Sequence, residues 1–305
     1  MKQVVIGMDC GGTYTRCLVG DLQGNVLKMR TESGSNPFDI GMNASLKVIK
    51  DLYFSTVGEE NFEVNHLCIS SSGIDLLGKY NALRKTISMM LKIPMERLEL
   101  FHDGVAALEG AFLGEDGILL ISGTGSVVIG KKGNKIVKFG GWGHILDDEG
   151  SAYDMALEAI KIAIVSEEEK KKTALINKVK AHFKISNLRE LLNIVYPCSP
   201  KFTIAGFSKD VIDCAKSRDE AALHVVNSTI KSLNRLLHMI ISEIGVLPVA
   251  LSGGLFSDEW FLQKFQMTNS YHFVKPALSS IIATYWMALG KPYDQTIVNK
   301  LRGKK

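Results

Sequence analysis

The chain has 305 residues, of which 46% are hydrophobic and 22% are charged, with a formal net charge of +4. This composition is typical of a folded globular protein and excludes disordered, collagen-like and low-complexity chains. The length predicts about two domains, and the small charge, without long runs of Lys and Arg, excludes a protein that coats nucleic acid.

Three strands joined by tight turns begin the chain, and a glycine pair lies in the first turn. Together they predict a β-meander. Apolar residues at three- and four-residue spacing then predict an amphipathic helix, and two further strands flank a second helix. The expected strands are 4–8, 15–20, 26–30, 66–70 and 98–101, and the expected helices are 41–57 and about 76–92.

The same order of elements begins again near residue 117, with strands expected at 117–122, 127–130 and 136–139. This repeat indicates an internal duplication, so we expect an α/β fold with two similar lobes and a cleft between them. The rest is mainly helical, with one buried strand at 247–251. The expected helices are 151–165, 168–182, 187–195, 208–217, 219–244 and 278–289, the last returning to the first lobe.

Three glycine-containing turns are candidates for binding phosphate or nucleotide. In the first, Asp9-Cys10-Gly11-Gly12-Thr13-Tyr14-Thr15, glycines let backbone N–H groups approach an anion, and the Thr13 and Thr15 hydroxyls add donors. Asp9 would reach a phosphate-bound Mg²⁺, usually through water. Taken alone, the same turn could be a plain hairpin.

The second turn, Gly123-Thr124-Gly125-Ser126, occupies the matching place in the second repeat. Gly125 to Lys131 also spells most of a P-loop, but Lys132 replaces its Ser or Thr and the intervening residues form a strand, which excludes a P-loop. The third turn, Gly253-Gly254, follows the buried strand. It could let a flat nucleotide approach the backbone, although a simple turn is an equal alternative.

Together, these turns on a duplicated meander resemble those of sugar kinases in the actin/Hsp70/hexokinase superfamily. More narrowly, the chain resembles the N-acetylglucosamine kinase family, which is grouped with the BadF/BadG/BcrA/BcrD ATPases. Residues 140–153 read almost as the family's G-G-W-G-x-x-x-x-D-E-G-S-x-Y, and residues 102–107 and 120–126 match as well. The resemblance implies two ribonuclease H-like (actin-like ATPase) lobes. Residues 1–113 plus about 285–305 would bind phosphate and sugar, and residues 114–284 would bind nucleotide and sugar.

The resemblance implies ATP and Mg²⁺ as cofactors and Asp103, after strand 98–101, as the catalytic base. A carboxylate there could take the proton from a sugar hydroxyl as it attacks the γ-phosphate of ATP. Without the resemblance, a helix cap would be the simpler role. The residues expected to bind the cofactors are Asp9, which is also the expected metal contact, Gly11, Gly12, Thr13, Thr15, Gly123, Thr124, Gly125, Ser126, Gly253 and Gly254.

The resemblance also implies sugar contacts. Asn36 matches an asparagine that binds sugar hydroxyls, although an Asx turn before proline is an alternative. Ser72 and Gly73 resemble a sugar-contacting Ser-Gly pair, with Ser71 as an alternative by one register.

Asp148 matches the family's sugar-binding acid, although an acid beside a helix start can also be structural. Gly141 and Trp142 are expected to shape a wall near the sugar's N-acyl group, unless Trp142 belongs to a core. Asp147 gives a second carboxylate where human-type members usually carry Gly, and no role is assigned to it.

The implied activity is ATP-dependent phosphorylation of an amino sugar, N-acetylglucosamine first, at the 6-hydroxyl. Glucosamine, N-acetylmannosamine and N-acetylmuramic acid stay open as substrates. The alternative is a BadF-type activator that couples ATP hydrolysis to a partner protein and carries cysteines for an iron–sulfur cluster. Neither Cys198 nor Cys214 sits in such a context. A sugar-responsive transcription regulator would need a helix-turn-helix ahead of the first strand, which is expected to begin at residue 4.

No C-x-x-C pair occurs among the five cysteines, so neither a zinc knuckle nor a disulfide framework is expected. The acidic Asp9 comes too early for a signal peptide, and no apolar stretch reaches about 18–20 residues, the length of a membrane span. We therefore expect a cytoplasmic protein without a nucleic-acid or membrane partner. The resemblance implies a homodimer that binds an amino sugar.

Overall fold

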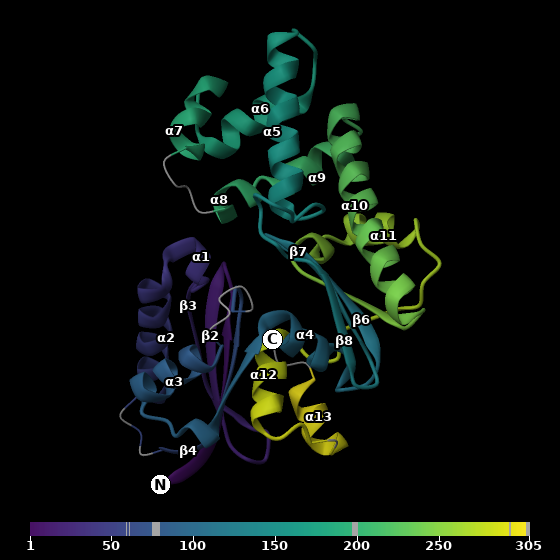
Figure 1. Ribbon diagram of the computed structural model, residues 1–305. Helices are drawn as coiled ribbons and strands as arrows, with labels where there is room; N and C mark the ends of the chain where they lie inside the picture. Colours follow the sequence, from purple (N-terminus) through teal and green to yellow (C-terminus); the bar gives the residue numbers. More distant parts are fainter. Residues whose placement is uncertain (59, 61, 75–79, 197–200, 293, 303–305) are drawn as a thin grey trace. The chain divides into compact units, whose positions relative to one another are not determined.

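The computed structural model describes residues 1–58, 60, 62–74, 80–196, 201–292 and 294–302. The chain divides into two compact units, Met1–Gly117 with Lys275–Lys305, and Ile118–Val274. Each unit contains one five-stranded sheet with helices packed on it (Figure 1).

The sheet of the first unit has the strand order β3-β2-β1-β4-β5. β1 is parallel to β4 and β4 is parallel to β5, whereas β2 is antiparallel to both β1 and β3. The expected meander and the two later strands are thereby confirmed. The strands are β1 (Lys2–Cys10), β2 (Tyr14–Gly20), β3 (Val26–Ser33), β4 (Phe62–Ser71) and β5 (Leu98–His102).

Helices cover both faces of this sheet. Val4 and Ile6 of β1 pack in the core with α2 and α3, whereas Val5 packs with α12, because successive side chains of a strand point to opposite faces. In Figure 1, α2 and α3 accordingly lie on one side of the sheet and α12 on the other. The helices are α1 (Pro37–Ile40), α2 (Met42–Val57), α3 (Tyr80–Leu91), η2 (Met95–Arg97), α4 (Asp103–Phe112), α12 (Ser280–Ala288) and α13 (Gln295–Leu301).

Two glycines allow the buried helix α12 to pack closely against its neighbours in the first unit. A Cβ atom added to Gly7 of β1 would lie 2.5 Å from the backbone nitrogen of Tyr285, and one added to Gly110 of α4 would overlap the Ala283 side chain. Only glycine permits so close an approach. Because α12 packs on β1 as a whole, the chain returns to the first unit at Lys275, ahead of the expected boundary at about residue 285.

The second unit repeats the strand order of the first. Its sheet has the order β10-β9-β6-β7-β8, so its first strand is central, with the next two on one side and the last two on the other. β6 is parallel to β9, β9 is parallel to β10, and β7 is antiparallel to β8. This repeat confirms the predicted duplication. The strands are β6 (Gly117–Ser122), β7 (Ser126–Lys132), β8 (Lys135–Gly140), β9 (Val249–Ser252) and β10 (Phe273–Val274).

One hydrophobic core joins the second sheet to its helices, with α10 against β7 at Gly130. The helix expected over 168–182 begins only at Ala174, because the Thr173 side chain caps it by accepting a hydrogen bond from the Leu175 N–H. The helices are α5 (Ala152–Glu168), α6 (Ala174–Phe183), η3 (Leu188–Leu191), α7 (Leu192–Val195), α8 (Lys201–Ala205), α9 (Ser208–Lys216), α10 (Glu220–Ile244), η4 (Leu255–Ser257) and α11 (Glu259–Gln266). Across the ranges that the structure describes, none of the helices combines the length and the apolar character needed to cross a membrane.

Candidate active site

The three parallel strands of the first unit end at the same edge of its sheet. Cys10 pairs with Ser71, and Ser71 pairs with His102. The residues at these strand ends are therefore neighbours, at the edge where open α/β sheets bind ligands. Asp9 and Asp103, the expected metal contact and the expected base, both lie at this edge.

Asp9 is 6% exposed and accepts hydrogen bonds from three side chains. Its Oδ2 accepts from Arg16 Nη2 at 2.6 Å and from Ser280 Oγ at 2.7 Å, and its Oδ1 accepts from Ser70 Oγ at 3.3 Å. Because both carboxylate oxygens already have partners in the chain, Asp9 fits a water-mediated contact to Mg²⁺ better than direct ligation.

The Gly11-Gly12 turn is fixed against the loop that follows β3. The Gly11 N–H donates to the Tyr14 carbonyl and the Ser35 N–H donates to the Gly11 carbonyl, each at 3.0 Å. A Cβ atom added to Gly34 would overlap the Gly12 carbonyl, so this contact requires glycine.

The two threonines of the turn have different surroundings. Thr13 is exposed, whereas Thr15 is fully buried and its hydroxyl donates to Ser35 Oγ at 2.8 Å. The Thr15 hydroxyl, expected to face a phosphate, is thus directed at the loop that carries Asn36.

Asn36 lies beside the Ser72-Gly73 pair. Gly73 has a φ of +75°, and a Cβ atom added to it would lie 3.0 Å from Asn36 Oδ1. The same oxygen accepts a hydrogen bond from the Phe38 N–H at 3.0 Å, so the Asx contact considered above is present and caps α1. Asn36 therefore combines a structural contact with a place next to the other expected sugar contacts.

Ser71 and Ser72 differ in their surroundings. Ser71 is 6% exposed and borders a small cavity lined by apolar side chains of α2, among them Leu46 and Ile49. Ser72 is half-buried, and its hydroxyl donates to the Cys10 carbonyl at 3.3 Å. Ser72 is therefore more exposed than Ser71, the alternative sugar contact one residue earlier.

Asp103 lies in the first turn of α4, with its side chain 36% exposed. The N-cap residue is His102, whose Nδ1 accepts a hydrogen bond from the Gly104 N–H at 3.0 Å. Asp103 Oδ1 accepts from the same N–H at 2.7 Å and lies 3.1 Å from His102 Nδ1. Both His102 and Asp103 therefore accept a hydrogen bond from the Gly104 N–H and cap α4, a role that the sequence alone would assign to Asp103.

In the second unit, β6 and β9 end together, since Ile121 pairs with Ser252. Gly253 has a φ of +105°, and a Cβ atom added to it would overlap the Ser122 carbonyl oxygen, so the close approach requires glycine. The second and third glycine turns are therefore neighbours.

The Asp148 side chain packs on the second glycine turn. It is 3% exposed and its residue has a left-handed φ of +61°. Its Oδ1 accepts a hydrogen bond from the Ser126 N–H at 3.2 Å, and its Oδ2 lies 3.6 Å from Lys201 Nζ, with no hydrogen-bond partner among the described residues. Burial raises the pKa of the Asp148 carboxyl, and the nearby Lys201 charge lowers it in part. A Cβ atom added to Gly125 would lie 2.9 Å from this carboxylate.

Trp142 is 63% exposed and so does not belong to a core. It lies in the loop after β8, in which Gly141 has a φ of +76°. Asp147 Oδ2 accepts a hydrogen bond from the Trp142 N–H at 3.3 Å. Asp147, to which the sequence assigned no role, therefore helps to shape the loop that presents the indole.

Sequence reasoning missed three side chains that hold the acids of the site, namely Arg16, Ser280 and Lys201. Arg16 could have been found, because it pairs with Asp9 in the register of the first hairpin. The contacts of Ser280 with Asp9 and of Lys201 with Asp148 join distant parts of the sequence, and no local pattern indicates them.

The chain matches the BadF/BadG/BcrA/BcrD ATPase family over residues 6–291. It therefore belongs to this family, and the resemblance drawn from its motifs is confirmed.

Two curated relatives are sugar kinases. The N-acetylmuramic acid/N-acetylglucosamine kinase of Clostridium acetobutylicum is 30% identical over 197 residues, which cover 63% of this chain and 64% of that protein. The glucosamine kinase GspK of Vibrio cholerae is 24% identical over 94% of this chain and 96% of that protein. The first match thus spans slightly less than two thirds of the relative.

Solved structures with a similar fold include a candidate N-acetylglucosamine kinase from Chromobacterium violaceum, with a TM-score of 0.78 and 20% identity over 94% of this chain and 99% of that one. A ROK family glucokinase from Streptomyces griseus, solved with glucose and AMPPNP, has a TM-score of 0.58 and 15% identity over 94% and 98% of the two chains. These likenesses confirm the predicted fold class, an α/β fold with two similar lobes of the actin-like type.

Proposed function

We propose that this chain is an ATP-dependent kinase that transfers the γ-phosphoryl group of ATP to the 6-hydroxyl of an amino sugar, N-acetylglucosamine first. The observation that carries the proposal is the register of the first sheet, in which Cys10, Ser71 and His102 are paired neighbours. This register supports a shared role for Asp9 and Asp103, which lie at these strand ends. The names of the curated relatives support the amino-sugar class.

Backbone N–H groups of two glycine turns, Gly11–Thr13 and Gly123–Ser126, would bind the phosphates of ATP. A bound Mg²⁺ would supply positive charge that neutralises the phosphates. Asp9 would hold a water ligand of the ion, with its carboxylate kept in place by Arg16 at 2.6 Å. Gly253 and Gly254 would flank the adenosine.

Asp103 would act as the general base. It lies in the first turn of α4, and its side chain is 36% exposed. It would accept the proton of the 6-hydroxyl as the sugar oxygen attacks the γ-phosphorus and the bond to ADP breaks.

Several side chains and backbone groups are proposed to hold the sugar. The exposed indole of Trp142 offers an apolar face to an N-acyl group, and the buried carboxylate of Asp148 would accept hydrogen bonds from sugar hydroxyls. The residues proposed to contact the sugar are Asn36, Ser72, Gly73, Gly141, Trp142 and Asp148.

The test is an ADP-release assay with ATP and Mg²⁺ over four sugars: N-acetylglucosamine, glucosamine, N-acetylmannosamine and N-acetylmuramic acid. We expect N-acetylglucosamine to raise ADP release well above the rate without sugar. An ATP turnover that no sugar changes would contradict the proposal and would favour an activator that couples ATP hydrolysis to a partner protein.

The cysteines do not support the activator alternative, which needs cysteines that can bind an iron–sulfur cluster at an interface. Cys214 is 2% exposed within α9, so its thiol is not presented to a cluster at an interface. Cys198 lies outside the residues that the structure describes.

A further inference from the structure

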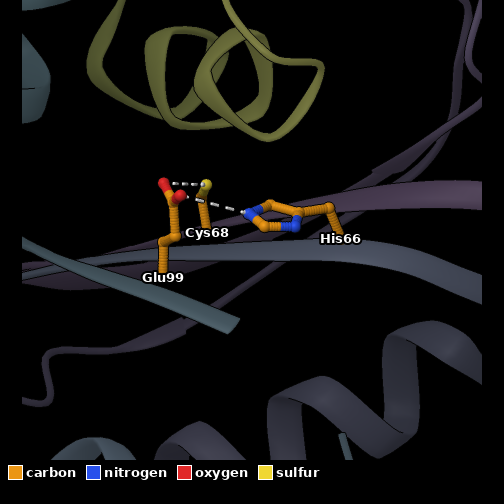
Figure 2. A group of neighbouring side chains, drawn as sticks. All are labelled: His66, Cys68 and Glu99. Carbon is orange, nitrogen blue, oxygen red and sulfur yellow. Dashed lines mark hydrogen bonds and ion pairs between the residues drawn. The ribbon is translucent and has the colours of Figure 1, made fainter. Parts of the chain in front are cut away.

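We propose that His66, Cys68 and Glu99 form a binding site for a divalent cation of the zinc class on the sheet of the first unit. His66 and Cys68 are two residues apart on β4, so their side chains point to the same face. Cys68 pairs with Glu99 of β5 in the parallel register, which brings the carboxylate across to the thiol. Figure 2 shows the three side chains converging above the two strands.

The distances between the three donor atoms are close to those between ligands of one metal ion. Cys68 Sγ lies 3.8 Å from Glu99 Oε2, and His66 Nε2 lies 3.7 Å from Glu99 Oε1. The three potential ligand atoms all lie within 4.8 Å of one another. Around a tetrahedral Zn²⁺ with bonds of about 2.0–2.3 Å, ligand atoms are about 3.3–3.6 Å apart. The His66 and Glu99 side chains are 26% and 48% exposed, so small rotations of both could bring the three donor atoms to that spacing.

The ligand types select the metal. Thiolate and imidazole favour Zn²⁺ and similar transition metals, whereas Mg²⁺ and Ca²⁺ prefer oxygen ligands. The Cys68 thiol donates a hydrogen bond to Glu99. Binding releases this thiol proton to solvent, and the resulting thiolate and the Glu99 carboxylate together balance the two positive charges of the ion. Lys291, the cation whose charge acts on Cys68, is itself paired with Glu109 at 2.8 Å.

The site is open on one side and distinct from the candidate active site. Cys68 is fully buried in the core that α12 covers, whereas the His66 side chain is 26% exposed. Solvent therefore has access for metal entry and for a water in the fourth position. At about 3.3 Å per residue, His66 lies about 16 Å along β4 from Ser71 at the strand end. A bound cation would tie β4 to β5.

The test uses metal-free full-length protein, kept reduced with a phosphine. We expect it to bind one Co²⁺ per chain with a thiolate-to-cobalt charge-transfer band in the near ultraviolet, and we expect Zn²⁺ to displace the Co²⁺. Zn²⁺ should also raise the thermal midpoint of unfolding, because it binds the folded state, whereas Mg²⁺ alone should not give this shift.

The variants decide the assignment. Cys68→Ala should abolish the band, and His66→Gln and Glu99→Gln should weaken Co²⁺ binding at least about tenfold, the lower limit for losing even an outer partner of a metal ligand. His66 and Glu99 are partly exposed, so these two variants remain informative if Cys68→Ala does not fold. The control is Cys17→Ala, which removes another fully buried thiol of the same sheet and should leave the band unchanged. Absence of the band, or equal Co²⁺ affinity in wild type, His66→Gln and Glu99→Gln, would overturn the proposal. Neither outcome bears on the kinase reaction.

Discussion

Asp9 and Asp148 are 6% and 3% exposed, and the chain stabilises them to different degrees. Asp9 accepts three side-chain hydrogen bonds, whereas Asp148 accepts one backbone N–H and has Lys201 at 3.6 Å from an oxygen without a hydrogen bond. Burial therefore raises the pKa of the Asp148 carboxyl. A buried acid held at a cost to folding is typical of a functional site.

Asp148→Asn should make the folded protein more stable near pH 7 while impairing sugar binding. The folded-state pKa of Asp148 is raised, so ionisation favours unfolding as the pH rises through that pKa. The cost is absent below the ordinary aspartate value of about 4. We expect the thermal midpoint of the variant to exceed that of wild type near pH 7, the difference to vanish near pH 4, and the KM for sugar to rise at least about tenfold.

The matched variant for this experiment is Lys201→Met, which removes the charge that compensates Asp148 and should lower the midpoint near pH 7. An Asp148→Asn protein that unfolds earlier than wild type at that pH would show that the carboxylate stabilises the fold.

Asp103→Asn should lower kcat by at least about 10²-fold and leave the KM for sugar nearly unchanged, since the amide keeps the shape of the side chain but cannot take a proton. Steady-state kinetics with N-acetylglucosamine measure this. Asp51→Asn, an exposed change of the same kind in α2, serves as the control. Turnover like that of wild type would remove Asp103 from the role of base.

The surroundings of a single residue were predictable where a local sequence pattern determines them, but not where they depend on distant parts of the chain. Asp103 is a candidate because of its motif, but the sharing of the cap with His102 depends on a side-chain geometry that the sequence does not specify. The burial of Thr15 depends on Ser35 across a loop, and the Lys201 contact with Asp148 depends on the folding of α8.

At the scale of elements, the candidate residues of each unit lie at strand ends and in the turns after them. β1, β4 and β5 end together in the first unit, and β6 and β9 end together in the second. Glycines at these turns allow backbones to approach where side chains would collide. The contrast between Gly253, which has no room for a Cβ atom, and Gly254, which has nothing within 4 Å of one, offers a direct test.

Gly253→Ala should destabilise the second unit by about 1–3 kcal/mol, because the new methyl group overlaps the Ser122 carbonyl and the residue has a φ of +105°. It should also weaken binding of a non-hydrolysable ATP analogue. Gly254→Ala should fold like wild type, so that any loss of nucleotide affinity there reports on the ligand contact. Denaturant unfolding and titration calorimetry measure both quantities. Equal stability of the two variants would contradict the strand-end geometry.

Most strands and long helices were predictable from periodicity and turn residues, because each pattern is local. The start of α6 was placed too early because the break before it depends on the cap at Thr173, and that hydroxyl is in turn bonded to Asp219 from another part of the chain. The short helices α8 and α11 were not predicted, since so few residues show no period.

At the scale of the whole molecule, the same sheet is built twice from one chain. Both sheets place their first strand at the centre and add the later strands in the same order. The sequence revealed this repeat through its glycine turns. It could not reveal where the chain returns to the first unit, because that depends on the packing of α12 against Gly7 of β1.

The most direct test of the proposed activity is to identify the product formed from ATP, Mg²⁺ and N-acetylglucosamine by the wild-type protein. Phosphorus–proton correlation in the NMR spectrum of the product assigns the phosphorylated carbon, and a 6-deoxy analogue of the sugar is the control. We expect N-acetylglucosamine 6-phosphate in amounts equal to the ADP released, and no phosphorylated product from the analogue. Release of ADP without any phosphorylated sugar would contradict the kinase assignment.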